Sequence, residues 1–161
     1  MDAGIETSAS RVVIAAVTDA PLDVAAHLAA VEDARAGAVA TFIGVVRDHD
    51  PGTVGEVVEL DYTAHPDAER FMLELAERFA APLADVPGDD LPDGADLVRI
   101  AVSHRIGTLG VGDLALVCAV ATAHRADAFD RCRALVEAIK AELPVWKRQR
   151  TADGSTNWVG L

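Results

Sequence analysis

The apolar residues of this sequence fall into short runs whose periodicity changes repeatedly between that of a strand and that of a helix. Residues 11–17, 38–46 and 97–102 are continuous or β-branched apolar runs, which are typical of strands. Between Pro66 and Pro82 the apolar residues instead recur every three or four positions, which predicts an amphipathic helix. Because segments this short cannot bury their apolar surface alone, the chain must stack strands and helices in layers.

The same three- and four-residue spacing predicts two further helices. The first follows Pro21 and stops at Gly37. Its apolar face consists of Val24, Leu28 and Val31. The second begins where Asp127 can act as its N-cap and ends before Pro144. Its apolar face consists of Phe129, Cys132, Leu135, Val136 and Ile139.

Two more strands are predicted at residues 56–62 and 113–122. Near the end of the chain, Asp153-Gly154 marks a hairpin that leads into the strand of Trp158. Strands and helices therefore alternate irregularly, with hairpin signals among them. This pattern favours an α+β fold in which about three helices pack on a mixed or antiparallel sheet.

Two segments are rich in glycine. Residues 107–112 are interpreted as a turn rather than a phosphate-binding loop, because strand-like sequence rather than a helix follows them. Residues 84–96 combine five aspartates with prolines and glycines, a composition that predicts a solvated surface insertion.

Length and composition limit the chain to one domain. With 161 residues, 51% of them hydrophobic, it is too short for two ordinary domains, so we expect a flexible segment at 1–10 and a single domain at 11–161. The longest apolar runs, such as 114–121, are shorter than the roughly 20 residues that cross a bilayer, and the start lacks the basic flank of a signal peptide. We expect a soluble cytoplasmic protein, with Cys118 and Cys132 reduced and packed in the core.

The formal net charge of −12 argues against a nucleic-acid partner, because binding a phosphate backbone requires a basic face. The basic residues are nevertheless unevenly distributed, since half of the fourteen fall in one C-terminal stretch. They are Arg125, Arg131, Arg133, Lys140, Lys147, Arg148 and Arg150. This stretch is where a small anion is expected to bind.

Common catalytic signatures are missing from the sequence. The five histidines form no His-x-x-x-His pair and there is no Cys-x-x-Cys, which makes a zinc site improbable. Neither a Gly-x-Ser-x-Gly elbow nor a Walker loop occurs, so the commonest hydrolases and nucleotide hydrolases are disfavoured. The remaining candidates are basic residues at the ends of predicted elements.

Arg47 closes an apolar strand, and His124 and Arg125 lie between a strand and the start of the last predicted helix. Arginine can bind a phosphate through two hydrogen bonds, helix amides favour negative charge, and histidine can transfer a proton. The alternative is that each is an exposed loop residue with a salt-bridge partner. The pair His104-Arg105 has no helix after it and is interpreted as structural.

The two lysines are a sharper signal, because the other twelve basic residues are arginines. Arginine does not release its proton, whereas a lysine amine near other cations can act as acid, base or nucleophile. Lys140 and Lys147 are set among Arg125, Arg148 and Arg150 in the C-terminal stretch. The alternative of two solvated lysines that stabilise the end of a helix remains open.

Four segments, in this order and spacing, resemble the family of molybdopterin synthase catalytic subunits. They are residues 37–47 (GAVATFIGVVR), 102–107 (VSHRIG), 123–125 (AHR) and 144–148 (PVWKR). Each motif alone is weak, but the four together extend the resemblance over roughly residues 11–158. The resemblance implies an α/β hammerhead-like version of the α+β fold.

The resemblance also implies a sulfurtransferase. In that family the enzyme converts cyclic pyranopterin monophosphate to molybdopterin. The sulfur comes from the thiocarboxylated C-terminal Gly-Gly tail of a small ubiquitin-like subunit. Two large subunits form a homodimer within a heterotetramer that also holds two small subunits. No metal and no organic cofactor are needed for this transfer.

Carried over by the resemblance, Lys140 and Lys147 are the catalytic lysines, and Arg47, His124 and Arg125 contact the anionic substrate. Neighbouring pocket positions are Val45, Val46, Arg148 and Gln149. A second hypothesis keeps the same basic pocket but gives it no chemistry, as a non-enzymatic sensor or carrier of a small phosphorylated metabolite. The two hypotheses differ in whether arginine can replace the lysines.

Overall fold

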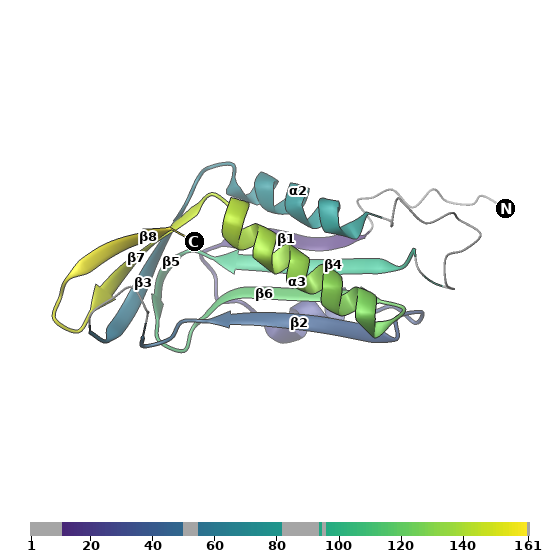
Figure 1. Ribbon diagram of the computed structural model, residues 1–161, viewed down its shortest axis with the longest axis horizontal. Helices are drawn as coiled ribbons and strands as arrows, with labels where there is room; N and C mark the ends of the chain where they lie inside the picture. The colour runs from purple at the N-terminus through teal and green to yellow at the C-terminus, as the bar shows by residue number, and fades with distance from the viewer. Residues whose placement is uncertain (1–10, 50–54, 82–93, 95, 161) are drawn as a thin grey trace.

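A computed structural model describes residues 11–49, 55–81, 94 and 96–160 (Figure 1). Within these residues the chain forms three helices and eight strands, arranged in two four-stranded sheets. The predicted α+β fold is therefore confirmed. The predicted flexible segment 1–10 and most of the predicted insertion at 84–96 lie outside the described residues.

The first sheet is mixed. Its strands lie in the order β1 (Val12–Thr18), β4 (Val98–Arg105), β6 (Leu114–Thr122) and β2 (Ala38–Val45). β1 and β4 are parallel, whereas β6 runs antiparallel to both of its neighbours. Residues 115–122 of β6 are all buried, because helices cover both faces of this sheet.

Two helices lie side by side on one face of the first sheet and the third covers the other face (Figure 1). The paired helices are α2 (Ala68–Ala80) and α3 (Arg125–Glu142), and the third is α1 (Val24–Ala30). Met72 of α2 and Leu135 of α3 are fully buried in the main core between these helices and the sheet. The helices predicted from the three- and four-residue spacing are all present.

The second sheet is antiparallel throughout and extends beyond one end of the first sheet (Figure 1). Its strands lie in the order β5 (Gly107–Gly110), β3 (Val57–Ala64), β7 (Val145–Thr151) and β8 (Thr156–Gly160). The hairpin predicted at Asp153-Gly154 joins β7 to β8. A small apolar cluster of Val46, Leu60, Leu109 and Ala115 packs the two sheets against each other.

The first helix differs from its prediction in length and orientation. It ends at Ala30 rather than near Gly37, and Leu28 is 40% exposed, whereas His27 is buried. The imidazole Nδ1 donates to the carbonyl of Asp23 at 2.6 Å, and Nε2 accepts from the Ser103 hydroxyl at 2.7 Å. Because both ring nitrogens of His27 have hydrogen-bond partners, its ring can be buried against the sheet where the sequence predicted Leu28.

The start of the last helix also corrects the sequence reading. The helix begins one residue after His124, which is its N-cap residue, and Asp127 lies in the first turn instead of capping it. The Asp127 carboxylate accepts a hydrogen bond from Arg131 at 2.8 Å. Phe129, predicted on the apolar face, is 65% exposed.

The glycine cluster at 107–112 is only partly a turn. Residues Gly107–Gly110 form β5, which pairs with β3 and buries Leu109 completely. The turn is confined to the next residues, where Gly112 has a φ of +92°, in the left-handed region that favours glycine. The element after this turn is strand β6 and not a helix, as predicted.

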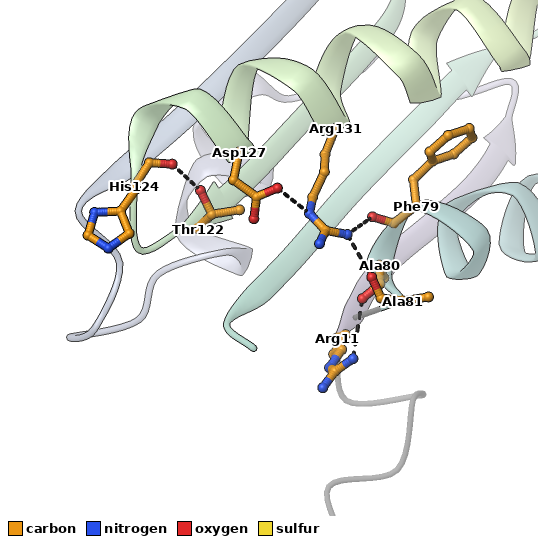
Figure 2. A network of polar contacts seen from close by, with 8 residues as sticks. All are labelled: Arg11, Phe79, Ala80, Ala81, Thr122, His124, Asp127 and Arg131. Carbon is orange, nitrogen blue, oxygen red and sulfur yellow. Dashed lines mark hydrogen bonds and ion pairs between the residues drawn. The ribbon is translucent and has the colours of Figure 1, made fainter. Parts of the chain in front are cut away.

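Arg131 ties the end of α2 to the start of α3 (Figure 2). Its buried guanidinium donates to the carbonyls of Phe79 and Ala81, at 2.7 and 2.8 Å, as well as to Asp127. Arg11 donates to the intervening carbonyl of Ala80 at 3.3 Å. The last carbonyls of a helix have no partner within the helix, so these two arginines satisfy them and offset the negative end of the helix dipole.

Cys118 and Cys132 are both buried and free, which agrees with their predicted place in the core. Among the helices of the described residues, none is long and apolar enough to span a membrane.

We predict that Arg131→Met lowers the free energy of unfolding by about 2–4 kcal/mol, because two carbonyls and one carboxylate lose a buried donor. Methionine keeps much of the apolar stem, so the loss reports mainly on the polar contacts. Urea denaturation measures the effect as a lower midpoint at an unchanged slope.

Arg70→Met is the matched control, because Arg70 makes exposed ion pairs with Asp67 and Glu74 on α2. It should change stability by less than about 1 kcal/mol. Equal effects of the two substitutions would contradict the stabilising role assigned to Arg131.

Candidate active site

A cavity of about 420 Å³ lies at the junction of the two sheets. It is lined by the end of β2 and the loop after it, by β4 and β6, by the last turn of α3, and by β3 and β7. The lining residues are Phe42, Ile43, Gly44, Val45, Val46, Arg47, His49, Val57, Leu60, Tyr62, His104, Ala115, Leu116, Ile139, Lys140, Lys147 and Gln149. No aspartate or glutamate is among these described residues, so the cavity favours a negatively charged ligand.

The pairing of β3 with β7 decides which side chains reach the cavity. Tyr62 lies opposite Lys147 and Leu60 lies opposite Gln149, and all four line the cavity. Successive side chains of a strand point to opposite faces, so Arg148 lies on the other face of the sheet. Of the three residues predicted on this strand, Lys147 and Gln149 line the cavity and Arg148 does not, and their roles stay predictions.

Arg148 is engaged on the outer face of the second sheet. Its guanidinium donates to the carboxylate of Asp61, its strand partner, at 2.6 Å and lies 5.7 Å from the ring of Trp158. The Thr108 hydroxyl, together with Arg148, holds the pKa of Asp61 below its ordinary value. The positive charge of Arg148 is thus balanced by Asp61 on the outer face, away from the cavity.

Lys140 comes to the cavity from the last turn of α3. Its Nζ lies 5.8 Å from the centre of the Phe42 ring, an arrangement that holds an ammonium group over an aromatic face. Phe42 belongs to β2 and also lines the cavity. Two lysines from different elements are therefore brought to one small volume.

Arg47 lies on the loop that follows β2, and that loop is fixed by backbone hydrogen bonds. The amide of Val46 donates to the carbonyl of Asp113 at 3.0 Å, and the amide of Gly112 donates to the carbonyl of Val46 at 2.8 Å. Arg47 is exposed at the rim of the cavity, next to Val45 and Val46. The three residues predicted at this strand end thus all lie at the cavity.

His124 and Arg125 do not lie at the cavity of their own chain. They are exposed at the N-terminal end of α3, where the Thr122 hydroxyl donates to the carbonyl of His124 at 2.7 Å (Figure 2). Lys140 lies near the other end of the helix, which at 1.5 Å per residue is roughly 20 Å away. One straight helix therefore cannot bring both groups to the same small ligand.

His104 and Tyr62 are among the cavity residues that the sequence did not predict. Their rings lie edge to face, with centroids 5.0 Å apart, and His104 is only 4% exposed. Burial lowers the pKa of His104, while the hydrogen bond of Nδ1 with the carbonyl of Arg105 opposes that shift. The two-residue period of β4 was the available signal, because His104 shares a face with the core residues Ile100 and Val102.

Comparison with known proteins supports the resemblance inferred from the motifs. The model of the MoaE protein family matches residues 17–142. The Mycobacterium tuberculosis protein named molybdopterin synthase catalytic subunit 1 is 38% identical over 145 residues, which cover 89% of this chain and 88% of that protein.

Solved structures agree with this assignment. The crystal structure of molybdopterin synthase from Staphylococcus aureus has a TM-score of 0.73 at 26% identity and covers 90% of this chain and 96% of that chain. The complex of subunits 1 and 2 of molybdopterin-converting factor from Helicobacter pylori 26695 has a TM-score of 0.63 over 89% of this chain and 88% of that one. At 18% identity, this second likeness shows the fold alone. On the family match and the extent of the M. tuberculosis alignment, the chain belongs to the MoaE protein family.

Proposed function

We propose that this chain is the large, catalytic subunit of a molybdopterin synthase. It transfers sulfur from the thiocarboxylated C-terminus of a small ubiquitin-like subunit to cyclic pyranopterin monophosphate and so forms the dithiolene of molybdopterin. The observation that carries the proposal is the meeting of Lys140 and Lys147 in one cavity, in a chain whose other basic residues are all arginines. The family match and the name of the M. tuberculosis relative support it.

Two chemically different kinds of cation, arginine and lysine, line the cavity. Arg47 at the rim provides a planar, permanently charged group that suits the cyclic phosphate. Lys140 and Lys147 provide compact ammonium groups that can polarise the carbonyl of the thiocarboxylate and stabilise the negative charge that develops during attack on the pterin side chain. A lysine can also give up and regain a proton, which arginine cannot.

The partner is a subunit whose C-terminal tail ends in Gly-Gly. Glycines carry no side chains, so such a tail would reach the lysines even through a narrow passage. The relative's description as a catalytic subunit supports the presence of a further subunit. We place the complex in the cytoplasm, where the free thiols of Cys118 and Cys132 would stay reduced.

The complete site is shared between two large subunits. His124 and Arg125 at the start of α3 in one copy would face Lys140 and Lys147 of the other copy. The length of α3, which separates the two groups within one chain, supports this arrangement. A homodimer of large subunits, each with one small subunit, would then hold two equivalent sites.

We predict that Lys140→Arg preserves the fold and the charge but lowers product formation at least about 100-fold. The reasons are that a guanidinium group does not give up its proton at the working pH and that it is broader than an ammonium group. Lys147→Arg should be impaired in the same direction. The measurement is the rate of dithiolene formation, with folding checked by circular dichroism.

Arg70→Lys, an exchange on the exposed side of α2, is the control and should leave the rate unchanged. Near-normal turnover of the folded Lys140→Arg variant would remove the catalytic role. It would favour the alternative of a non-enzymatic anion binder, which tolerates arginine with only a modest loss of affinity.

We predict that one bulky residue added after the terminal glycine of the small subunit stops sulfur transfer, because the extended tail cannot place its end at the lysines. Product is measured after mass spectrometry has confirmed that the extension is intact. Sulfur transfer from an untrimmed, extended tail would show that the tail does not thread into the cavity.

We predict complementation between Arg125→Ala and Lys140→Ala chains. In a two-fold dimer, each mixed pair has one intact site and one doubly altered site, so random one-to-one mixing should restore about a quarter of wild-type activity. The two variants are refolded together and product is measured after subunit exchange has been verified. Activity no higher than that of either variant alone would place the whole site within one chain.

A further inference from the structure

The proposed sulfur transfer requires a second chemical step, and the following inference rests on that proposed function. When the sulfur of a thiocarboxylate attacks an acceptor carbon, an oxygen substituent of that carbon leaves with its electron pair and takes up a proton, and the immediate product is a thioester between the small subunit and the acceptor. The sulfur stays on the acceptor only if water then cleaves the bond between the acyl carbon and sulfur. Cleavage by water is assisted by a base that is neutral at the working pH and lies in the same cavity.

We propose that His104 is the general base for this cleavage and thus a further catalytic residue of the cavity. Its Nδ1 lies 2.7 Å from the carbonyl oxygen of Arg105, and a carbonyl can only accept, so Nδ1 carries the proton. The other nitrogen, Nε2, then has a free lone pair. Because His104 lines the cavity, Nε2 is the ring nitrogen available to a water molecule bound there.

The surroundings of His104 fix the ring and keep it neutral. The ring is almost fully buried and packs edge to face against Tyr62, which limits its rotation. Desolvation by burial lowers the pKa of His104, so the neutral form dominates near pH 7. Once Nε2 has accepted a proton, the carbonyl of Arg105 stabilises the imidazolium through Nδ1, as the orienting group of a catalytic triad does.

The other titratable and charged groups of the cavity suit different roles. They are Arg47 and His49 after β2, Tyr62 of β3, Lys140 of α3 and Lys147 of β7. Arginine and ammonium groups stabilise the oxyanion of the tetrahedral intermediate but carry no lone pair, and tyrosine is a weak base at neutral pH. His49 lies at the exposed rim and is the one other imidazole among the described lining residues.

The step balances without any further reactant. Nε2 of His104 takes one proton from water while the water oxygen bonds to the acyl carbon. The bond between carbon and sulfur then breaks, and its electron pair leaves with the sulfur as a thiolate on the acceptor. The proton on Nε2 passes to that thiolate or to solvent, and the small subunit is left with an ordinary C-terminal carboxyl group. No oxidant or reductant is consumed.

The direct test is His104→Gln in the complete complex with the thiocarboxylated small subunit and the cyclic precursor. We expect turnover to fall at least about 100-fold. A covalent adduct of small subunit and pterin should accumulate, visible by intact-protein mass spectrometry and cleaved by hydroxylamine as a thioester is. His65→Gln is the matched control, because His65 is exposed and outside the cavity; it should show neither effect.

The outcomes separate this inference from the proposed function. Normal turnover of His104→Gln, or lost turnover without an adduct in a variant that still binds the small subunit, overturns the role of His104 alone. Wild-type protein that yields neither product nor adduct overturns the proposed function and this inference with it.

A second measurement does not need the His104→Gln variant and decides the matter even if that variant does not fold. The reaction needs the neutral ring, so the turnover number should fall as the pH falls through the pKa of His104, which burial places below its ordinary value of 6.5. Titration of isotopically labelled histidine by NMR gives that pKa independently. A fall in turnover number whose midpoint coincides with the measured pKa of His104, and which persists in His49→Gln, supports the assignment. The assignment is overturned if the fall is absent, if its midpoint differs from that pKa, or if it disappears in His49→Gln.

Discussion

The register between β3 and β7 is the constraint on which the whole cavity depends. Tyr62 and Leu60 face the same side as Lys147 and Gln149, and the residues between them face the opposite side. A slip of one residue would turn Lys147 away and place Arg148 in the cavity. The ion pair between Arg148 and Asp61, on the outer face, opposes such a slip because it forms only in the observed register. A contact outside the cavity therefore helps to determine which cation lies within it.

Helix α3 is the second element on which the site depends, because it carries candidate residues at both ends. Arg131 fixes its first turns to the end of α2, and its last turn places Lys140 over Phe42. The packing of α3 in the main core thus also fixes the position of Lys140. The length of α3 also separates His124 from Lys140 of the same chain by roughly 20 Å, at 1.5 Å per residue.

Local sequence pattern predicted the elements well and the contacts between distant elements poorly. The spacing of apolar residues found α2 because Met72 and its neighbours face a core along the whole helix. The spacing of apolar residues did not predict the buried face of α1. His27 is buried there because it bonds to Ser103, a residue 76 positions away in the sequence. The spacing also failed at Phe129, since apolar character alone does not show whether a neighbouring strand covers that part of the helix. The lysines were identifiable because their residue type is rare in this chain, whereas His104 was hidden by its place in an apolar strand.

The function proposed for this cavity is sulfur transfer and not anion binding alone. It is tested most directly by mixing the purified chain with the thiocarboxylated small subunit and cyclic pyranopterin monophosphate, and then quantifying the dithiolene and the spent small subunit by mass spectrometry. We expect molybdopterin to form and two thiocarboxylates to become carboxylates for each dithiolene, because each dithiolene contains two sulfur atoms. Binding of the cyclic phosphate with no consumption of thiocarboxylate would contradict it.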